Sequence, residues 1–514
     1  MLLATAVLLA ACSTGAVRGA QGPSPTAGSG LAAPTATTTP AATTTPAAST
    51  VPSREPLSRG VLSRWVPCAD GFTCATLTVL LDDARPALGT VALALTRRAA
   101  TRPAQRVGSL LVDPGGPGDS AVDFLQAAWT YVPAEVRARF DLVAFDPRGV
   151  GHTAPVTCGS TAELDAYFHA DPDPRTPAGL AALDVANRAF AAGCARRSGR
   201  VLPYVGTTIV AQDMDRVRAA LGDPRLTYLG YSYGTSIGAS YLDQFPTHVR
   251  AMVLDGAIDP TLSWDRMLAG QAKGFDVALG AFLADCQARG CAFRRAVQGD
   301  LLAAYDRLVA QVAAHPLPGA GGRTVGAAEF ATGVLYGLYS KNLWPSISAA
   351  LVAADQGRGG PLLALNDTYL QRSDGGYSNI LQAFDAVTCT DRPWPRTDAP
   401  YLALGNRIGA SYPRFGRSIA LAGLACSVWP LPATGRPHAV RAPASPPVVV
   451  VGTTRDPATP YAWAVALAGQ LAHGVLLTSV GDGHTAYRST ASPCLVSRVD
   501  RYLLTGQAPA PTTC

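Results

Sequence analysis

Short apolar runs typical of β-strands recur along the chain and alternate with segments of helical periodicity. Apolar positions repeat at helical spacing across 207–221, and Gly222 follows as a stop signal. Strands separated by helices indicate a mostly parallel sheet covered by helices on both faces, with ligands bound beyond the carboxyl ends of the strands. The strands predicted in this α/β fold are 76–81, 89–95, 109–112, 140–145, 226–229, 250–255, 447–451 and 475–480.

Residues 259–443 interrupt this alternation, because helical patterns dominate there and clear strands are missing. An insertion of this kind after a core strand is expected to lie above the strand ends as a cap. We therefore expect a core built from 61–258 and 444–514, with 259–443 as a large, mainly helical cap. The helices predicted in the cap are 266–289, 299–314, 326–338, 344–355 and 401–408.

The first residues form an apolar run that ends in Leu-Ala-Ala-Cys at 9–12. A short apolar run followed by small residues is typical of a secretory signal and is too short to span a bilayer. The ending resembles a bacterial lipobox, so 1–12 is predicted as a lipoprotein-type signal peptide, with Cys12 as the lipidated residue. No Lys or Arg precedes the run, and the alternative is an ordinary secretory peptide with a cysteine at this position by chance.

Residues 13–60 are rich in Thr, Pro, Ala, Ser and Gly and contain the repeat Thr-Thr-Thr-Pro-Ala. Such a composition cannot bury enough apolar surface to fold, so a disordered tether is expected. A lipid anchor followed by a flexible spacer predicts an exported protein of the cell envelope or, without the anchor, an extracellular one. The membrane is then reached only through the N-terminal lipid.

The 514 residues carry a formal net charge of +6, yet the basic residues are scattered arginines without a cluster or an aromatic-basic stripe. This pattern predicts a solvated surface and no nucleic-acid partner. Besides Cys12 the number of cysteines is even, which predicts disulfides in an exported chain. Sequence does not determine their connectivity, and nearest-neighbour pairing is our expectation. No C-x-x-C pair or adjacent histidine points to a metal. The expected pairs are Cys68–Cys74, Cys158–Cys194, Cys286–Cys291, Cys389–Cys426 and Cys494–Cys514.

The stretch Gly-Tyr-Ser-Tyr-Gly at 230–234 follows the predicted strand 226–229 and precedes a segment of small residues. This is the G-x-S-x-G nucleophile elbow, in which a serine is exposed on a tight turn between strand and helix. Chance matches to this short motif are common, but the preceding strand and the following small residues favour the functional interpretation. Ser232 is therefore the predicted nucleophile.

The turn Asp-Pro-Gly-Gly-Pro-Gly at 113–118 follows the third core strand. Acyl transfer develops negative charge on the carbonyl oxygen, and main-chain N–H donors stabilise it. In this fold one donor follows the nucleophile, here Tyr233, and the other comes from the loop after the third core strand. Gly116 is the predicted second donor, with Gly115 as the reserve. By itself the motif would be an ordinary Pro/Gly turn.

A serine hydroxyl needs a base to take its proton and a carboxylate to orient that base. Among seven histidines, only His484 comes directly after a predicted strand and downstream of the other motifs. Asp456 precedes it by one helix and one strand, in the order Ser…Asp…His of α/β-hydrolases. Asp255 is the competing acid, and Asp482 lies too close to His484 in sequence and is expected to form a turn.

Aromatic residues of the cap could line a substrate pocket or simply pack in the core of the cap. Asp391 follows a cysteine of an expected disulfide in the cap. We take as a hypothesis that its carboxylate binds the free α-amine of a substrate.

These motifs together resemble the exported actinobacterial tripeptidyl aminopeptidases and their mycobacterial lipoprotein relatives, within the proline-iminopeptidase-like serine hydrolases. The resemblance covers residues 65–514 and implies an α/β-hydrolase fold, a Ser232/Asp456/His484 triad, no cofactor and a peptidase that acts from the N-terminus of its substrate. It also implies that Thr459 supports the acid. Asp113 and Asp119 depart from the family pattern, which has Asn or His and then Gly or Ser. The stretches that carry the resemblance are 65–79, 113–118, 145–151, 230–235, 456–460 and 481–484.

The sequence thus predicts an exported, monomeric serine exopeptidase that releases a tripeptide or similar short peptide from a peptide or protein with a free N-terminus. Two alternatives stay open. A carboxylesterase would use the same triad with a different pocket, and an envelope binding protein would keep the fold without catalysis.

Overall fold

The computed structural model describes residues 57–514. The predicted signal peptide with Cys12, and residues 13–56 of the predicted tether, lie outside the described residues. Residues 57–60 have no regular secondary structure and lead into the first strand.

One twisted sheet forms the centre of the described part, in the strand order β1-β3-β4-β6-β5-β7-β8-β13-β14-β15, with β2 paired to β3. The pairs β3–β4 and β4–β6 are antiparallel, and all pairs from β6 to β15 are parallel. Parallel strands have their carboxyl ends at one edge of the sheet. The predicted motifs lie in the loops that begin at this edge. The strands are β1 (Val61–Leu62), β2 (Val66–Ala69), β3 (Phe72–Leu80), β4 (Thr90–Arg98), β5 (Gly108–Asp113), β6 (Phe140–Phe145), β7 (Leu226–Tyr231), β8 (Val249–Asp255), β13 (Val448–Arg455), β14 (Gly474–Asp482) and β15 (Thr512–Thr513).

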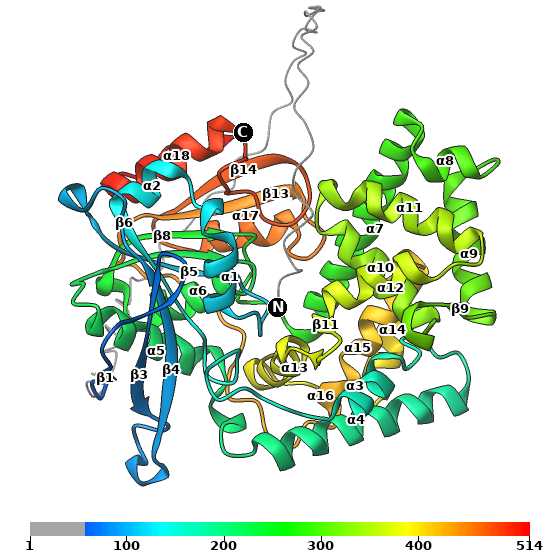
Figure 1. Ribbon diagram of the computed structural model, residues 1–514, viewed down its shortest axis with the longest axis horizontal. Coiled ribbons are helices and arrows are strands. Elements are labelled where there is room, and N and C mark those ends of the chain that lie inside the picture. Colours follow the sequence, from blue (N-terminus) through cyan, green and yellow to red (C-terminus); the bar gives the residue numbers. More distant parts are fainter. Residues whose placement is uncertain (1–56) are drawn as a thin grey trace, which may run out of the picture. The chain divides into compact units, whose positions relative to one another are not determined.

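Helices cover both faces of this sheet (Figure 1). Because side chains alternate along a strand, Val448 and Val450 of β13 belong to one apolar cluster, and Val449 and Val451 belong to another. The first cluster contains α5 (Thr207–Ala220), α6 (Gly234–Gln244) and α17 (Tyr461–Gln470). The second contains α1 (Ala121–Ala128), α2 (Ala134–Arg139) and α18 (Pro493–Thr505). Burial on both faces explains why the strands read as continuous apolar runs.

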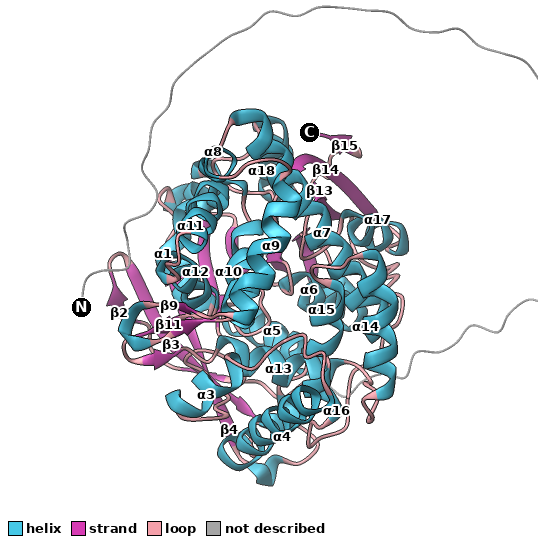
Figure 2. Ribbon diagram, turned by 90° about the vertical axis from the view of Figure 1, so that its right-hand side faces the viewer, coloured by secondary structure: helices cyan, strands magenta, loops and turns pink. Residues whose placement is uncertain are grey.

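The segment between β8 and β13 forms the predicted helical cap, which faces the viewer in Figure 2. It has an apolar core of its own, around Phe282, Trp344 and Leu351. Short strand pairs, β9 (Leu317–Pro318) with β10 (Thr324–Val325) and β11 (Arg372–Ser373) with β12 (Gly376–Tyr377), connect some of its helices. The helices are α7 (Trp264–Arg289), α8 (Ala292–Ala296), α9 (Leu301–Ala314), α10 (Ala327–Leu338), α11 (Trp344–Asp355), α12 (Gly360–Tyr369), α13 (Ile380–Asp391), α14 (Ala399–Ser411), α15 (Gly416–Ala422) and α16 (Leu424–Ser427).

A second segment joins the cap from within the part of the chain that we assigned to the core. Helices α3 (Thr161–Phe168) and α4 (Pro177–Ser198) follow β6 and lie beside α13 and α16 (Figure 1). Arg372 of β11 forms an ion pair of 2.8 Å with Asp165 of α3, and Arg417 of α15 donates to the carbonyl of Pro174 at 2.8 Å. The cap is therefore built from two insertions, and the boundary drawn after residue 258 captures only one of them.

Five disulfides stabilise the described residues, and their pairing is the nearest-neighbour pairing that we expected: Cys68–Cys74, Cys158–Cys194, Cys286–Cys291, Cys389–Cys426 and Cys494–Cys514. Cys389–Cys426 joins α13 to α16 inside the cap. Within residues 57–514, no helix combines the length and the apolar character needed to cross a bilayer.

Candidate active site

Ser232 occupies the sharp turn between β7 and α6, at the carboxyl edge of the sheet. Its φ of 53° lies in the left-handed region, which non-glycine residues seldom adopt. The turn is tight because a Cβ at Gly230 would lie 2.6 Å from the carbonyl oxygen of Gly234. The N–H of Ser232 donates to the carbonyl oxygen of Asp255 at the end of β8, 2.8 Å away. The elbow predicted from the sequence is thus present as a strained, hydrogen-bonded turn.

His484 and Asp456 meet behind the ends of β13 and β14. Nδ1 of His484 lies 2.9 Å from each carboxylate oxygen of Asp456. Asp456 is 3% exposed, and its carboxylate accepts hydrogen bonds from the N–H groups of Ala458 and Thr459. The hydroxyl of Thr459 also donates to it at 3.0 Å. These bonds orient the carboxylate toward the imidazole.

The electrostatics of His484 combine two opposing effects. Burial lowers its pKa, but the neighbouring carboxylates of Asp456 and Asp255 raise it, and the net pKa lies above the ordinary value of a histidine. Asp482, which we expected to form a turn, ends β14 and pairs with Arg455 and Lys341 instead of the imidazole.

Asp255, the competing acid, has a different place. Its carboxylate accepts hydrogen bonds from the N–H groups of Ala486 and Tyr487, two and three residues beyond His484. Burial raises the pKa of Asp255 to about 6, against the effect of these bonds. Since its carbonyl also accepts from Ser232, one residue connects the turn of the nucleophile to the loop of the histidine.

Asp255 thus joins the turn of Ser232 to the loop of His484 through its main-chain carbonyl and its carboxylate. A Cβ added to Gly256, next to Asp255, would lie 3.1 Å from Cε1 of His484. Among the described residues, Nε2 of His484 is buried without a hydrogen-bond partner. The imidazole thus keeps one nitrogen on Asp456 and leaves the other without a partner among the described residues.

Two main-chain donors are available beside the elbow. Within residues 57–514, neither the N–H of Tyr233 nor that of Gly116 donates a hydrogen bond. The N–H of Gly115, the reserve donor, is already bonded to the carboxylate of Asp113 at 2.9 Å. Gly115 packs so tightly that a Cβ there would lie 2.9 Å from both Cβ of Ser232 and the nitrogen of Tyr233. Burial raises the pKa of Asp113 to about 7.

A cavity of about 360 Å³ opens in front of Ser232, between the elbow and the cap. Gly116, Ser232 and Tyr233 line it, together with residues of α5, of α6 and of the cap. The walls are mostly apolar, with acidic side chains on α13. The lining contributed by the cap includes Tyr339, Tyr369, Phe384, Asp385 and Asp391.

Asp391, which we took as the binding site for a substrate amine, is engaged by the protein itself. Its two carboxylate oxygens accept from the N–H of Thr207, at 2.7 Å, and from the hydroxyl of the same residue. The hydroxyl of Tyr233 lies 2.6 Å from the Thr207 hydroxyl and donates to it, because the proton of the latter goes to Asp391. Asp391 therefore anchors the first residue of α5 and, through it, the residue after Ser232.

Comparison with known proteins places this chain in a family. Serine protease Hip1 of Mycobacterium tuberculosis is 39% identical over 469 residues, which cover 87% of this chain and 89% of that protein. Tripeptidyl aminopeptidase of Streptomyces lividans is 33% identical over 470 residues, covering 87% and 85%. Residues 412–514 match the family model described as TAP-like protein, an α/β-hydrolase family. This chain belongs to the TAP-like α/β-hydrolases.

The names carried by these relatives differ in the bond they refer to. Carboxylesterase B of Mycobacterium tuberculosis is 39% identical over 444 residues, covering 85% of each chain. The TAP-like family thus contains proteins named as peptidases and as an esterase, at similar identity to this chain. The chain is a serine hydrolase, and the finer choice depends on the cavity.

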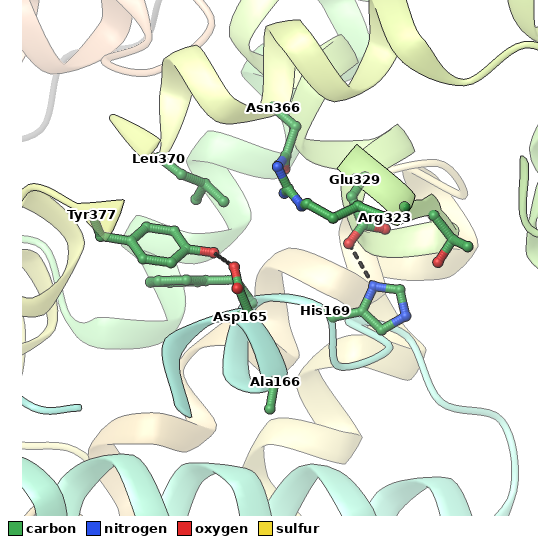
Figure 3. A pocket seen from close by; sticks show the side chains of 11 residues that line it. Asp165, Ala166, His169, Arg323, Glu329, Asn366, Leu370 and Tyr377 are labelled. Carbon is green, nitrogen blue, oxygen red and sulfur yellow. Dashed lines mark hydrogen bonds and ion pairs between the residues drawn. The ribbon is translucent and has the colours of Figure 1, made fainter. Parts of the chain in front are cut away.

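This TAP-like hydrolase has a second cavity, of about 310 Å³, between α3 and the part of the cap that follows β8 (Figure 3). Its charged side chains are paired with each other. His169 lies 2.6 Å from Glu329, Tyr377 donates to Asp165 at 2.6 Å, and Arg323 pairs with Asp367 just outside. Their pairing stabilises the contact between the two insertions of the cap and leaves no charged group for a ligand.

Two residues of the site carry no signal in the sequence. Thr207 and Asp385 reach the cavity from a covering helix and from the cap, where no motif marks them, whereas Tyr339 is one of the cap aromatics expected to line the pocket or to pack in the cap core. Only the helical spacing of Phe384, Thr388 and Asp391 could have indicated that α13 turns one face to a common space.

Proposed function

We propose that this protein is a serine exopeptidase that releases short peptides, a tripeptide or similar, from the free N-terminus of a peptide or protein. The observation that carries the proposal is the buried His484, held by Asp456 through Nδ1 and unpartnered at Nε2, on a loop that Asp255 connects to the turn of Ser232. A base oriented in this way can take the proton of a serine hydroxyl.

In the proposed mechanism, Nε2 of His484 accepts the proton of the Ser232 hydroxyl while Oγ attacks the scissile carbonyl. The negative charge on the carbonyl oxygen is stabilised by the N–H groups of Tyr233 and Gly116. His484 then gives its proton to the leaving amine, and an acyl-enzyme on Ser232 remains. Water, deprotonated by His484, hydrolyses the ester and restores the serine. No cofactor takes part.

The second candidate is a carboxylesterase. It is favoured by the mostly apolar walls of the cavity and by the esterase name of one relative. The same nucleophile and base would act, because an ester is an easier acyl donor than an amide. The presence of acidic side chains on α13 favours the peptidase, since esters of fatty acids offer no cation to such groups.

The proposal is tested with aminoacyl, dipeptidyl and tripeptidyl chromogenic amides, each with a free and a blocked N-terminus, beside p-nitrophenyl esters. We expect the highest kcat/KM for a short peptidyl amide with a free amine, and a fluorophosphonate adduct on Ser232. Hydrolysis of esters alone would make the protein an esterase. A missing adduct, with no loss of activity in Ser232→Ala, would contradict both candidates.

We also propose that the enzyme is exported, acts as a monomer and is held at the cell envelope by a lipid on Cys12. Five disulfides in the described residues support export, because such bonds persist in oxidising compartments. Expression of Cys12→Ala in an actinobacterial host should release the protein from the membrane fraction. Equal membrane association of both proteins would contradict the anchor.

A further inference from the structure

Helix α13 forms one wall of the cavity and presents two carboxylates to it. Phe384, Thr388 and Asp391 recur at helical spacing and line the cavity together with Asp385. Close contacts with a neighbouring loop fix the position of this helix. A Cβ at Gly118 would lie 2.2 Å from the carbonyl oxygen of Ile380, so the start of α13 packs directly on the loop that carries Gly116.

The two carboxylates differ in how far the protein satisfies them. Both oxygens of Asp391 accept hydrogen bonds from Thr207, and its neighbour Arg392 offsets the charge. Asp385 accepts one hydrogen bond, from the hydroxyl of Tyr167 at 3.3 Å. Among residues 57–514, no Lys, Arg or His forms an ion pair with Asp385.

A carboxylate in such surroundings is costly to keep charged. Burial raises the pKa of Asp385 to about 7, and the hydrogen bond from Tyr167 offsets this only in part. A buried charge is tolerated when a partner of opposite sign satisfies it. Since Asp385 is partly accessible and lines the cavity in front of Ser232, that partner can arrive with the substrate.

We propose that Asp385 binds the N-terminal ammonium group of the peptide substrate. The inference rests on the proposed exopeptidase function and names the residue that makes it an exopeptidase. A free α-amine is cationic at neutral pH and forms a charge-assisted hydrogen bond with the carboxylate in a site of low dielectric. An acylated N-terminus has no charge and would leave Asp385 buried and unpaired.

The rigid placement of α13 gives this contact a second consequence. Its start packs on the Gly116 loop, and its end is held by Asp391 on Thr207 and by the disulfide Cys389–Cys426. The separation between the ammonium site and Ser232 is therefore constant. A constant separation lets only fragments of one short length reach the nucleophile, while longer N-terminal extensions do not fit between the two groups.

The test compares a tripeptidyl chromogenic amide with its N-acetylated form, on the full-length protein and on Asp385→Asn. The proposal expects a higher kcat/KM for the free amine in the unaltered protein, and a fall of that preference by about 10- to 100-fold in Asp385→Asn, mainly through KM. An unchanged preference would overturn it. The midpoint of urea unfolding should be the same for Asp385→Asn and the unaltered protein, which shows that the variant is folded.

Two further variants separate the roles of similar carboxylates. Asp391→Asn should lower kcat for free and blocked substrates alike, with the preference for the free amine unchanged. If the preference is lost in Asp391→Asn and kept in Asp385→Asn, the ammonium site is Asp391 and the proposal is wrong. Asp500→Asn is the matched control, because Asp500 also accepts from one tyrosine hydroxyl, that of Tyr487, but lies outside the cavity. It should keep the preference.

If Asp385→Asn fails to fold, the unaltered protein still decides. A tripeptide product with a free amine should inhibit ester hydrolysis at least about tenfold more strongly than its N-acetylated form. Equal inhibition would overturn the ammonium site. If amides are hydrolysed through Ser232 but free and blocked peptides react equally, the peptidase function stands and the role of Asp385 is wrong. If no amide is hydrolysed, the proposed function itself is wrong.

Discussion

The main-chain N–H of His484 donates a hydrogen bond of 2.8 Å to the carbonyl oxygen of Tyr339, so the candidate base is attached directly to the cap. Around this bond, Ser340 and Gly483 form an isolated antiparallel bridge, and Lys341 pairs with Asp482 at 3.5 Å. The ring of Tyr339 meets the imidazole edge-on, with centroids 5.4 Å apart. The cap therefore positions the base as well as covering the cavity.

Removing this ring should slow the reaction. In Tyr339→Ala we expect kcat for an ester substrate to fall by about 10- to 100-fold, because a displacement of about 1 Å of a catalytic group costs this much. Tyr339→Phe is the control, since it keeps the ring against His484 and loses only the interaction of the hydroxyl with Tyr369. Its kcat should stay within about threefold. Equal losses in both variants would show that the hydroxyl matters and not the ring.

The pH dependence of ester hydrolysis should report the ionisation of His484. Its pKa is raised above the ordinary value of about 6.5, and only the neutral imidazole can accept the serine proton. Activity is therefore lost as pH falls through the raised pKa, and the acid limb of kcat/KM should have its midpoint above about 6.5. Asp456→Asn should move the midpoint down and lower kcat by about 10⁴-fold. An acid limb that is the same in both proteins would contradict the assignment.

The preference for a free N-terminus should have a pH dependence of its own. Asp385 is neutral below its pKa of about 7 and then attracts no ammonium, so the preference should be lost as pH falls through this value. The groups that face it are the hydroxyls of Tyr167 on α3 and Tyr369 on α12, both with pKa values raised by burial, so they stay neutral in this range. The ratio of kcat/KM for free and blocked amides isolates the effect, because His484 acts on both. A ratio that does not vary between about pH 5.5 and 7.5 would exclude Asp385.

A methyl group at Gly115 should damage the oxyanion loop. Its Cβ would lie 2.5 Å from the carbonyl oxygen of Tyr231 and 2.9 Å from Cβ of Ser232, and its φ of 100° disfavours any other residue. We expect Gly115→Ala to lower kcat by at least about 100-fold. Gly222→Ala is the control that separates backbone strain from steric clash. Gly222 also has a positive φ, of 78°, but there is open space around its Cβ position. That control should lose about 1 kcal/mol of stability and keep its kcat.

Breaking the disulfide between α13 and α16 should affect stability and substrate preference together. The double variant Cys389→Ser/Cys426→Ser opens a link across 37 residues of sequence, and we expect a loss of about 2–4 kcal/mol in the free energy of unfolding by urea. Because α13 carries Asp385, KM for the free amine should also rise. The pair Cys68–Cys74 spans only 6 residues and joins β2 to β3. Its removal should therefore lower the free energy of unfolding by less and leave KM unchanged.

Much of this site could be predicted because it depends on neighbours in sequence. The elbow at Ser232 needs small residues at fixed offsets, and the runs around 448–451 and 250–255 are buried on both faces, so their composition alone marks them as central strands. Parallel strands bring the loops that follow them to one edge of the sheet, which is why the sequence predicts that Ser232, Asp456 and His484 lie at one site.

The sequence by itself determined the central sheet and the loops at its carboxyl edge. Hydrophobic periodicity and turn residues define these elements within a few neighbouring positions. Only the tertiary structure decided which carboxylate meets which partner. The carboxylate of Asp255 bonds to the N–H groups beyond His484 and not to its imidazole. The carboxylate of Asp391 bonds to Thr207, and Asp385 lines the cavity. The helices that carry these aspartates are positioned by packing between segments far apart in the chain. The sequence therefore shows that a residue is an aspartate, but it does not show whether that carboxylate is buried or which group it faces.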